Sequence, residues 1–284
     1  MNSHATFALS TGLLLTLGHL AQGQTYSQRV LADNPVGYWR LDETTVGTVF
    51  DSAGGNDNGT HNNFTGALLN QPGAPIDEVN SATRFNGINN ATGSFIQGPL
   101  TATTFDDSWT IETWFNHTSQ SQWAGLFSNN VAPQQASAPL LTMNADSNLF
   151  GINQAGVSAQ NISVDLGAGH FNKWLYGAIT YTAGTNLFDV YVYDPSVDPT
   201  GANPQHATGA AYWTLNENSN NFLIGRHWTS DTQIWGGLLD EVAVYNTALT
   251  QAQLTNHVVP EPTSLGLALA GGTAMLGLLR RRQA

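Results

Sequence analysis

The acidic side chains are candidate catalytic residues, because two carboxylates about 5–10 Å apart can act as acid and base at a glycosidic bond. On a β-strand such a pair needs positions i and i+2 or i+4, since alternate side chains share a face. Glu112 has no acidic neighbour at either spacing. Three adjacent pairs should point to opposite faces of a strand: Asp42–Glu43, Asp106–Asp107 and Asp240–Glu241. His-x-x-x-His, His-Glu and Gly-x-Ser-x-Gly motifs are absent. The sequence therefore predicts a protein without catalytic activity.

Oxygen-bearing side chains in loops suggest a second kind of chemistry, the binding of a hard cation such as calcium. The segment DSAGGNDNGT (51–60) places Asp51, Asn56 and Asn58 in one short loop, with Asp57 between them. Asp240, near the last expected strand, is the fourth candidate ligand. The alternative is that these side chains bond the backbone of their own turn, as Asp and Asn commonly do.

The tryptophans suggest a third kind of chemistry, carbohydrate binding. Sugar rings stack on exposed aromatic faces while polar side chains form hydrogen bonds with the sugar hydroxyls. Four of the eight tryptophans lie in or beside polar loops and are the candidate ligand contacts: Trp123, Trp213, Trp228 and Trp235. The alternative is that they close an end of the fold. The other four lie in strand-like segments and are expected in the core: Trp39, Trp109, Trp114 and Trp174.

The composition limits which partners the protein can bind and which interactions can stabilise its fold. The net charge is −12, and only five of the eight basic residues precede the C-terminal tail. An acidic body makes nucleic acid an improbable partner. The chain has no cysteine, which excludes disulfides and cysteine-based zinc sites. A hydrophobic content of 41% is nevertheless sufficient for a proper core.

Short apolar or alternating segments separated by Gly, Asn, Asp and Pro predict an all-β sandwich or barrel. In 187–193, for example, Phe188, Val190 and Val192 share one face. The segment 195–209, rich in Pro and Gly, is expected to be a long loop. One short helix is expected near the end, because Thr250 and Gln253 fit a capping box. The expected strands are 37–41, 82–85, 94–96, 108–116, 124–128, 140–144, 149–153, 174–181, 187–193, 221–225 and 237–245.

Several motifs, in order, carry a resemblance to a known family. They are GYWRLDE (37–43), DSAGGNDNGT (51–60), ATRFNG (82–87), WTIETWF (109–115), KW (173–174), FLIGR (222–226) and GGLLDEVAVYNTAL (236–249). Together they resemble the bacterial laminin-G-like, concanavalin A-like domain, here residues 24–258. The resemblance implies a two-sheet antiparallel jelly roll, a fold that also builds glycosidases. It further implies a bound calcium with ligands from distant parts of the chain.

The first 23 residues are expected to be a secretory signal peptide. An apolar segment, 7–20, is followed by Ala21-Gln22-Gly23, which has the small-x-small pattern of a cleavage site. No Lys or Arg precedes the apolar segment, which departs from the usual pattern. The alternative, a core helix, fits poorly because turn-rich sequence follows directly.

The last 26 residues, 259–284, have the three parts of a sorting signal. Pro260-Glu261-Pro262 precedes 17 uncharged residues (263–279), and Arg280, Arg281 and Arg282 follow. This order resembles the PEP-CTERM signal of Gram-negative bacteria. It implies a hydrophobic helix transiently in the inner membrane, an exosortase-type enzyme as partner, and delivery to the cell envelope, cell surface or extracellular matrix. The alternative is a permanent membrane anchor.

These observations lead to one main hypothesis and two rivals. We expect an exported, non-catalytic protein that binds extracellular polysaccharide or surface glycan through a lectin-like sandwich. A structural or adhesive protein that contacts other proteins is the first alternative. A glycosidase or lyase on the same fold is the second.

Overall fold

The computed structural model describes residues 23–88, 91–101, 105, 107–119, 124–129, 139–143, 148–150, 162–210, 220–227 and 233–259. Every helix and strand given below belongs to one compact unit, Gln24–Pro260. Within the described ranges, no helix is long and apolar enough to cross a membrane. The predicted signal peptide, the hydrophobic C-terminal helix and the sorting motif lie outside those ranges and stay predictions.

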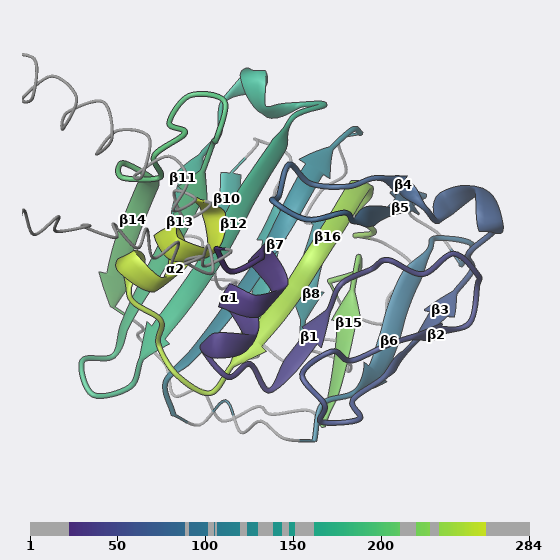
Figure 1. The fold of residues 1–284 in the computed structure, drawn as a ribbon, viewed down its shortest axis with the longest axis horizontal. Helices are drawn as coiled ribbons and strands as arrows, with labels where there is room; N and C mark the ends of the chain where they lie inside the picture. Colours follow the sequence, from purple (N-terminus) through teal and green to yellow (C-terminus); the bar gives the residue numbers. More distant parts are fainter. Residues whose placement is uncertain are drawn as a thin grey trace, which may run out of the picture. The chain divides into compact units, whose positions relative to one another are not determined.

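Two antiparallel β-sheets form the body of the unit (Figure 1). Sheet A contains, in order, β14 (Gln205–Ala210), β13 (Leu187–Tyr193), β12 (Trp174–Thr182), β7 (Trp109–His117), β16 (Gly236–Tyr245), β5 (Ser81–Asn86) and β4 (Gln71–Pro72), with β1 (Gly37–Trp39) also paired to β16. Sheet B contains β11 (Ser163–Asp165), β10 (Asn148–Phe150), β9 (Leu140–Met143), β8 (Ala124–Ser128), β15 (Asn221–Ile224), β6 (Phe95–Pro99), β3 (Gly59–Asn62) and β2 (Thr48–Val49). Short 3-10 turns are η1 (Gly66–Leu68) and η3 (Ala168–His170).

This sandwich confirms the predicted fold class, and each expected strand segment contains a strand. The short strands β2, β3, β4 and β11 are additional. The expectation of a loop over 195–209 was partly wrong, because β14 pairs with β13 along Gln205–Ala210. Pro and Gly in that segment do not prevent pairing at a sheet edge, where β14 has only one neighbour.

Alternate side chains of the strands point into the space between the two sheets and form the main core. In the central strand β7, Trp109, Ile111 and Phe115 point toward sheet B. The predicted face of β13, made of Phe188, Val190 and Val192, lies in the same cluster. Trp39 is also buried there, which confirms the core assignment of both tryptophans.

A second core covers the outer face of sheet A. Helices α1 (Tyr26–Ala32) and α2 (Gln251–Val258) lie over this face and pack on Trp114 and several tyrosines (Figure 1). The predicted capping box of α2 is confirmed, since Thr250 and Gln253 cap each other. The helix α1 was not predicted. Its Thr25 and Gln28 form the same box, so the signal was present in the sequence.

A buried polar network fixes α2 to sheet A. Glu112 of β7 is fully buried and accepts hydrogen bonds from the hydroxyls of Tyr176 and Tyr245, the latter at 2.8 Å. His257 of α2 places Nδ1 at 3.1 Å from Glu112 and Nε2 at 2.9 Å from Asp33. Because both ring nitrogens face carboxylates, both must donate, so the ring is an imidazolium. Burial alone lowers the pKa of His257, but the carboxylates of Glu112 and Asp33 outweigh it and raise the pKa.

Gly225, which follows β15, tests how tightly the two sheets are packed. Its φ is +79°, and an added Cβ would lie 2.1 Å from Cδ1 of Phe85. We expect Gly225→Ala to lower the free energy of unfolding by about 2–4 kcal/mol, through left-handed strain and overpacking. Gly184 is the matched control, because an added Cβ there meets nothing within 4 Å. Urea unfolding should show a change of at most about 0.5 kcal/mol for Gly184→Ala; equal effects of the two variants would contradict the packing argument.

Candidate functional site

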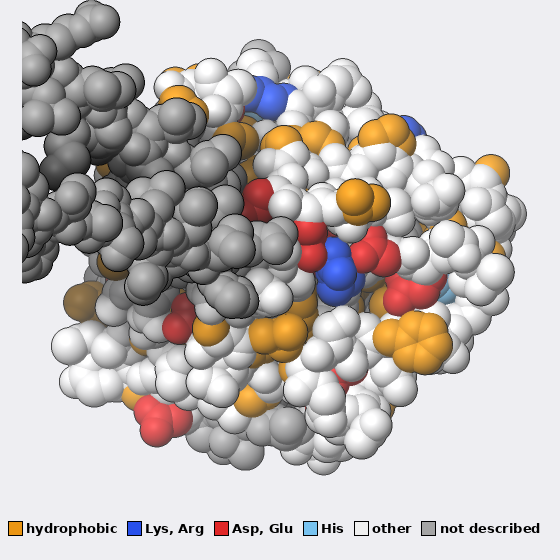
Figure 2. Space-filling view, in the orientation of Figure 1, with side chains coloured by type: hydrophobic (Ala, Val, Ile, Leu, Met, Phe, Trp, Pro, Cys, Tyr) orange, Lys and Arg blue, Asp and Glu red, His pale blue; other side chains and the backbone are white. Residues whose placement is uncertain are grey.

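The segment between β1 and the loop after β2 forms an open groove of about 350 Å³. One guanidinium, two carboxylates, several hydroxyls and one aromatic ring line it: Arg40, Asp42, Glu43, Thr44, Thr45, Thr48, Phe50 and Ser52. Figure 2 shows exposed hydrophobic side chains beside a gathering of acidic side chains around a basic one. The side chain of Phe50 is 62% exposed. The groove therefore combines hydrogen-bonding groups with one exposed aromatic ring.

Backbone contacts hold this segment in a fixed shape. Leu41 is buried in the core although its φ is +62°, which turns the chain away from β1. Gly47, at φ +150°, is bonded to His61 of β3 through both its N–H and its C=O. The N–H of Phe50 donates to Oε1 of Glu43 at 2.9 Å. The backbone of Phe50 is thus anchored while its ring faces solvent.

Glu43 has one carboxylate oxygen without a partner. Its Oε2 is buried and makes no hydrogen bond within the described part of the chain. Burial raises the pKa of this carboxyl. An unsatisfied buried carboxylate oxygen is unfavourable, which fits the raised pKa of this group.

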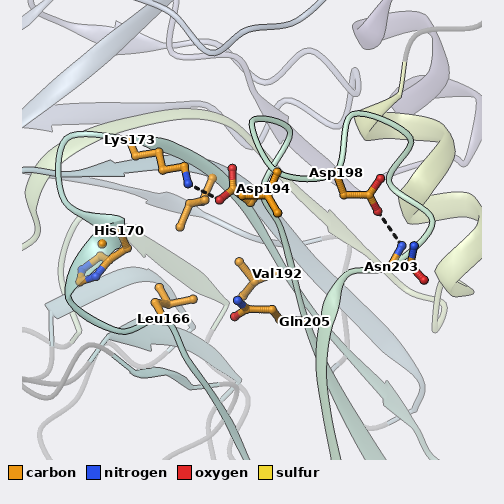
Figure 3. A pocket seen from close by; sticks show the side chains of 11 residues that line it. Leu166, His170, Lys173, Val192, Asp194, Asp198, Asn203 and Gln205 are labelled. Atoms are coloured by element: carbon orange, nitrogen blue, oxygen red, sulfur yellow. Dashed lines mark hydrogen bonds and ion pairs between the residues drawn. The ribbon is translucent and has the colours of Figure 1, made fainter.

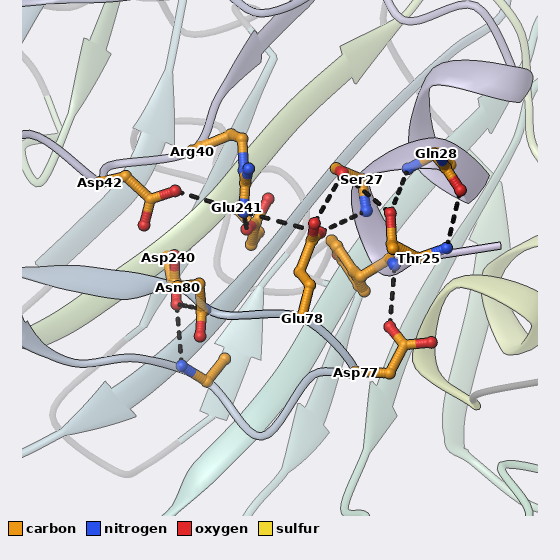
Figure 4. A network of polar contacts seen from close by, with 12 residues as sticks. Thr25, Ser27, Gln28, Arg40, Asp42, Asp77, Glu78, Asn80, Asp240 and Glu241 are labelled. Carbon is orange, nitrogen blue, oxygen red and sulfur yellow. Dashed lines mark hydrogen bonds and ion pairs between the residues drawn. The ribbon is translucent and has the colours of Figure 1, made fainter.

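Arg40 sets the charge at the inner side of the groove. Its Nη2 lies 3.2 Å from Oδ2 of Asp42, 3.2 Å from Oε1 of Glu241 and 3.6 Å from Oε1 of Glu78 (Figure 4). One guanidinium therefore bridges three carboxylates from separate parts of the chain. It keeps an acidic region compact and orients Asp42 at the groove.

A β-bulge in β16 corrects one sequence-based expectation. Asp240 and Glu241 were expected on opposite faces, but the pairing with β7 shifts between Asp240 and Ala243, and Glu241 has φ +53°. Leu239 and Val242 consequently both face the inter-sheet core. Both carboxylates lie on the other face, where Asp240 Oδ2 accepts from Ala74 N at 2.8 Å and Glu241 accepts from the hydroxyl of Tyr38. A bulge adds one residue to one strand and so breaks simple alternation.

The buried carboxyl groups of Asp240 and Glu241 make the free energy of unfolding depend on pH. Burial raises the pKa of Glu241 to about 8, and burial and the nearby Glu241 raise that of Asp240. A carboxyl with a raised folded-state pKa contributes stability below its unfolded pKa, and loses it as pH rises through the folded pKa. The contribution of this pair to the free energy of unfolding should therefore fall as pH rises from 5 to 8, by up to about 1.4 kcal/mol per unit for one group.

Glu241→Gln should make this dependence shallower, since glutamine does not titrate. Urea unfolding at several pH values measures it. Asp107→Asn is the control, because Asp107 is exposed and should leave the slope unchanged. Parallel slopes in the wild type and Glu241→Gln would show that Glu241 is not buried in its neutral form.

The four predicted metal ligands lie on two elements: Asp51, Asn56 and Asn58 in the loop between β2 and β3, and Asp240 in β16. Oδ1 of Asp51 accepts from the backbone N–H of Tyr38 and Ala53, at 3.0 and 2.9 Å. The side chain of Asn58 accepts from Asp51 N at 2.8 Å, and Asn56 is an exposed turn residue with φ +62°. Asp240 makes its contacts elsewhere, with Ala74 and Asn80. Within the described residues, no group of three or more His, Asp or Glu side chains could hold a metal ion. The turn interpretation therefore fits Asp51 and Asn58 better, and calcium stays an untested prediction.

The tryptophan predictions have two different outcomes. Trp235 is 0% exposed, packs on Phe115 and stacks on His117 at 4.8 Å between centroids. Its expected role as a ligand contact was wrong, because the ring lies in the inter-sheet core, where its Nε1–H donates to the backbone C=O of Leu238. Trp123, Trp213 and Trp228 lie outside the described residues. The exposed aromatic ring that the structure does show, Phe50, was not among the candidates; its polar neighbours, Asp42 to Thr45, were the available signal.

The two antiparallel sheets form a sandwich of the jelly-roll kind, an architecture that hosts many unrelated functions. The chain matches the laminin-G-type model Laminin_G_3, described as the concanavalin A-like lectin/glucanases superfamily, over residues 90–255. That match covers more than half of the sequence. The chain belongs to this superfamily, which confirms the predicted resemblance of the sandwich. No curated protein matches the sequence significantly.

Solved structures agree on the fold at low sequence identity. The binding domain of botulinum neurotoxin DC, in complex with rat synaptotagmin II, aligns with a TM-score of 0.56 and 13% identity over 80% of this chain and 52% of that chain. Domain 4 of an extracellular arabinanase from Geobacillus stearothermophilus, in complex with arabinotriose, gives 0.51 and 16% over 79% and 98%. A sialidase from Trypanosoma rangeli gives 0.50 and 13% over 78% and 32%.

These likenesses establish the fold alone. The chain spans about half the length of the neurotoxin chains it matches. Binding domains and glycosidase-related proteins both occur among the neighbours. The fold by itself therefore does not decide whether the chain has catalytic activity.

Proposed function

We propose that this protein binds a carbohydrate chain in the groove beside Phe50. The observation that carries the proposal is the 62% exposed ring of Phe50, at the edge of a groove lined with carboxylates and hydroxyls. Phe50 is the one aromatic residue among the exposed large hydrophobic side chains of the described ranges. A sugar ring presents an apolar face to such a ring while its hydroxyls bond the polar groups around it.

The arrangement of charge favours a neutral or weakly charged glycan. Arg40 is already shared among three carboxylates, so it offers no uncompensated positive charge to an anionic polymer. The partly exposed carboxylate of Asp42 and the threonine hydroxyls of the groove can accept hydrogen bonds from sugar hydroxyls. Two structural neighbours support the proposal: the arabinanase domain is in complex with arabinotriose, and botulinum neurotoxin type C depends on two ganglioside molecules for cell entry.

The proposed activity is binding without catalysis. The two carboxylates that the bulge places on one face, Asp240 and Glu241, are both fully buried. A glycosidic bond cannot reach them in this arrangement, and acid–base catalysis requires contact with the substrate. Arg40 and Tyr38 occupy the hydrogen-bonding positions of Glu241.

A glycan and polysaccharide binding screen on the full chain tests this function. It should be run with calcium and again with a chelator, and its positives checked by a reducing-end assay. Binding without release of reducing ends is the expected result. Failure to bind any polysaccharide, with the fold verified by circular dichroism, would favour a structural or adhesive protein. Release of reducing ends would favour a glycosidase.

We further propose that the protein is exported and sorted to the cell envelope, which rests on the sequence motifs at 1–23 and 259–284. In a Gram-negative host with an exosortase-type enzyme, the wild type should reach the envelope or matrix in a shortened form. Replacing both Pro260 and Pro262 with alanine should leave the uncut form in the inner membrane. Fractionation with mass measurement distinguishes the two forms; identical processing of both proteins would contradict the sorting proposal.

A further inference from the structure

A second pocket lies on a different part of the molecule. It is found at the edge where the two sheets meet, between η3, the start of β12 and the loop that follows β13 (Figure 3). Its volume is about 110 Å³, and it shares no residue with the groove beside Phe50. It is therefore an independent place for a ligand.

The floor of this pocket is apolar and well supported. Leu175 of β12 and Val192 of β13 line it and belong to the inter-sheet core. Leu166, which follows β11 of the other sheet, packs against the same core from the facing side. Side chains that belong to a close-packed core move little, so the floor is preformed.

The charged groups at the pocket compensate one another. Lys173 forms an ion pair with Oδ2 of Asp194 (Figure 3). The other oxygen of Asp194, Oδ1, accepts hydrogen bonds from Ser196. The carboxylate of Asp198 accepts from Thr200 and from the backbone N–H of Asn203. A fully charged ligand would thus find no unpaired opposite charge, and an anion would meet two carboxylates.

Two side-chain amides remain available for a ligand. Asn203 and Gln205 line the pocket, and neither side chain has a hydrogen-bond partner among the described residues. An amide offers both donors and an acceptor. Lys173 adds N–H donors beyond the one that Asp194 receives. Neutral groups that both donate and accept hydrogen bonds, such as alcohols, match this set.

The volume of the pocket suits a single sugar ring. A cavity needs about 10–15 Å³ to hold one water, so 110 Å³ corresponds to about seven to eleven water-sized positions. A hexose has about twelve non-hydrogen atoms, close to this range, whereas a disaccharide is about twice too large. We infer that this pocket binds one neutral sugar ring, such as the end residue of a glycan, with its apolar face on Leu175 and Val192 and its hydroxyls on Asn203 and Gln205.

The test uses the full chain and neutral monosaccharides as probes, namely glucose, galactose, mannose and N-acetylglucosamine, with glucuronic acid as the charged comparison. Saturation-transfer NMR and titration should show a millimolar Kd for at least one neutral sugar, since a ligand this small cannot bind tightly by hydrogen bonds and one apolar face. Gln205→Ala and Asn203→Ala should each weaken binding about two- to tenfold.

Gly169→Leu is the decisive variant. Gly169 lines the pocket, and an added Cβ meets no atom within 4 Å, so we expect a leucine side chain there to occupy pocket space without strain at its Cβ. Gly184→Leu is the matched control, because Gly184 has the same open surroundings in the turn between β12 and β13. Binding should be lost in Gly169→Leu and kept in Gly184→Leu.

The outcomes separate this inference from the groove at Phe50. Monosaccharide binding that survives Phe50→Ala but not Gly169→Leu supports the pocket, whatever the polysaccharide screen shows. Binding unchanged by Gly169→Leu overturns it, as does the absence of binding by any neutral probe at tens of millimolar. Tighter binding of glucuronic acid than of the neutral sugars also overturns it.

Discussion

Replacing Glu112 with alanine should lower the free energy of unfolding by about 3–5 kcal/mol, the usual cost of removing one partner of a buried ion pair. Two tyrosine hydroxyls would lose their acceptor, and the imidazolium of His257 would be left buried beside a cavity. This loss is a large part of the 5–15 kcal/mol, in order of magnitude, that holds a domain folded. Urea unfolding followed by tryptophan fluorescence measures it.

Two comparison variants show whether the loss of stability in Glu112→Ala comes from removing a buried charge. Glu112→Gln keeps the shape and removes the charge, so it should be destabilising even though the side chain still accepts hydrogen bonds. Asp189→Asn is the surface control, because Asp189 pairs with the partly exposed His206 and should change stability by less than about 1 kcal/mol. A Glu112→Ala variant as stable as Asp189→Asn would show that the buried carboxylate does not anchor α2.

Phe50→Ala should weaken polysaccharide binding about 10- to 100-fold. Covering a phenylalanine side chain contributes about 1.5–3 kcal/mol, and each 1.4 kcal/mol is a tenfold change in Kd. The ring is exposed in the free protein, so folding should be unaffected. Affinity electrophoresis or calorimetry with a polysaccharide found in the screen measures the change, and Phe50→Trp should retain binding.

Val79→Ala is the matched control for Phe50→Ala. Val79 is 99% exposed and apolar, but it does not line the groove. A general effect of surface hydrophobicity would weaken both variants alike, whereas a specific site loses affinity only at Phe50. Unchanged binding in Phe50→Ala would move the glycan site to another part of the surface.

The sandwich could be predicted from the sequence because the patterns that indicate its strands and its C-terminal helix each lie within a few neighbouring residues. A period of two over 187–193 decides which side of β13 faces the core, and the structure agrees at Phe188, Val190 and Val192. The capping box at Thr250 likewise requires only four residues. Helix α1, which was not predicted, has an equally local signal in the capping box of Thr25 and Gln28, directly after the predicted signal peptide.

The site was less predictable because its geometry is set by distant parts of the chain. The inward turn of Trp235 depends on Phe115 and His117, more than a hundred residues earlier. The bulge at Glu241 has no motif that announces it, yet it moves a carboxylate to the other face of the sheet. Phe50 follows a strand of only two residues, too short for any period to show whether the ring is buried.

The pairing of α1 with α2 has a mechanical consequence. Arg29 of α1 donates to the backbone C=O of His257, and Gln253 of α2 donates to Asp33, so the first and last helices of the unit are joined directly. A pulling force applied before Tyr26 and after Val258 would therefore load this helix pair and its contacts with Glu112, rather than shearing strands in either sheet. The helix pair would act as the yielding element under tension, and the sandwich with its two pockets would be the part that keeps its shape.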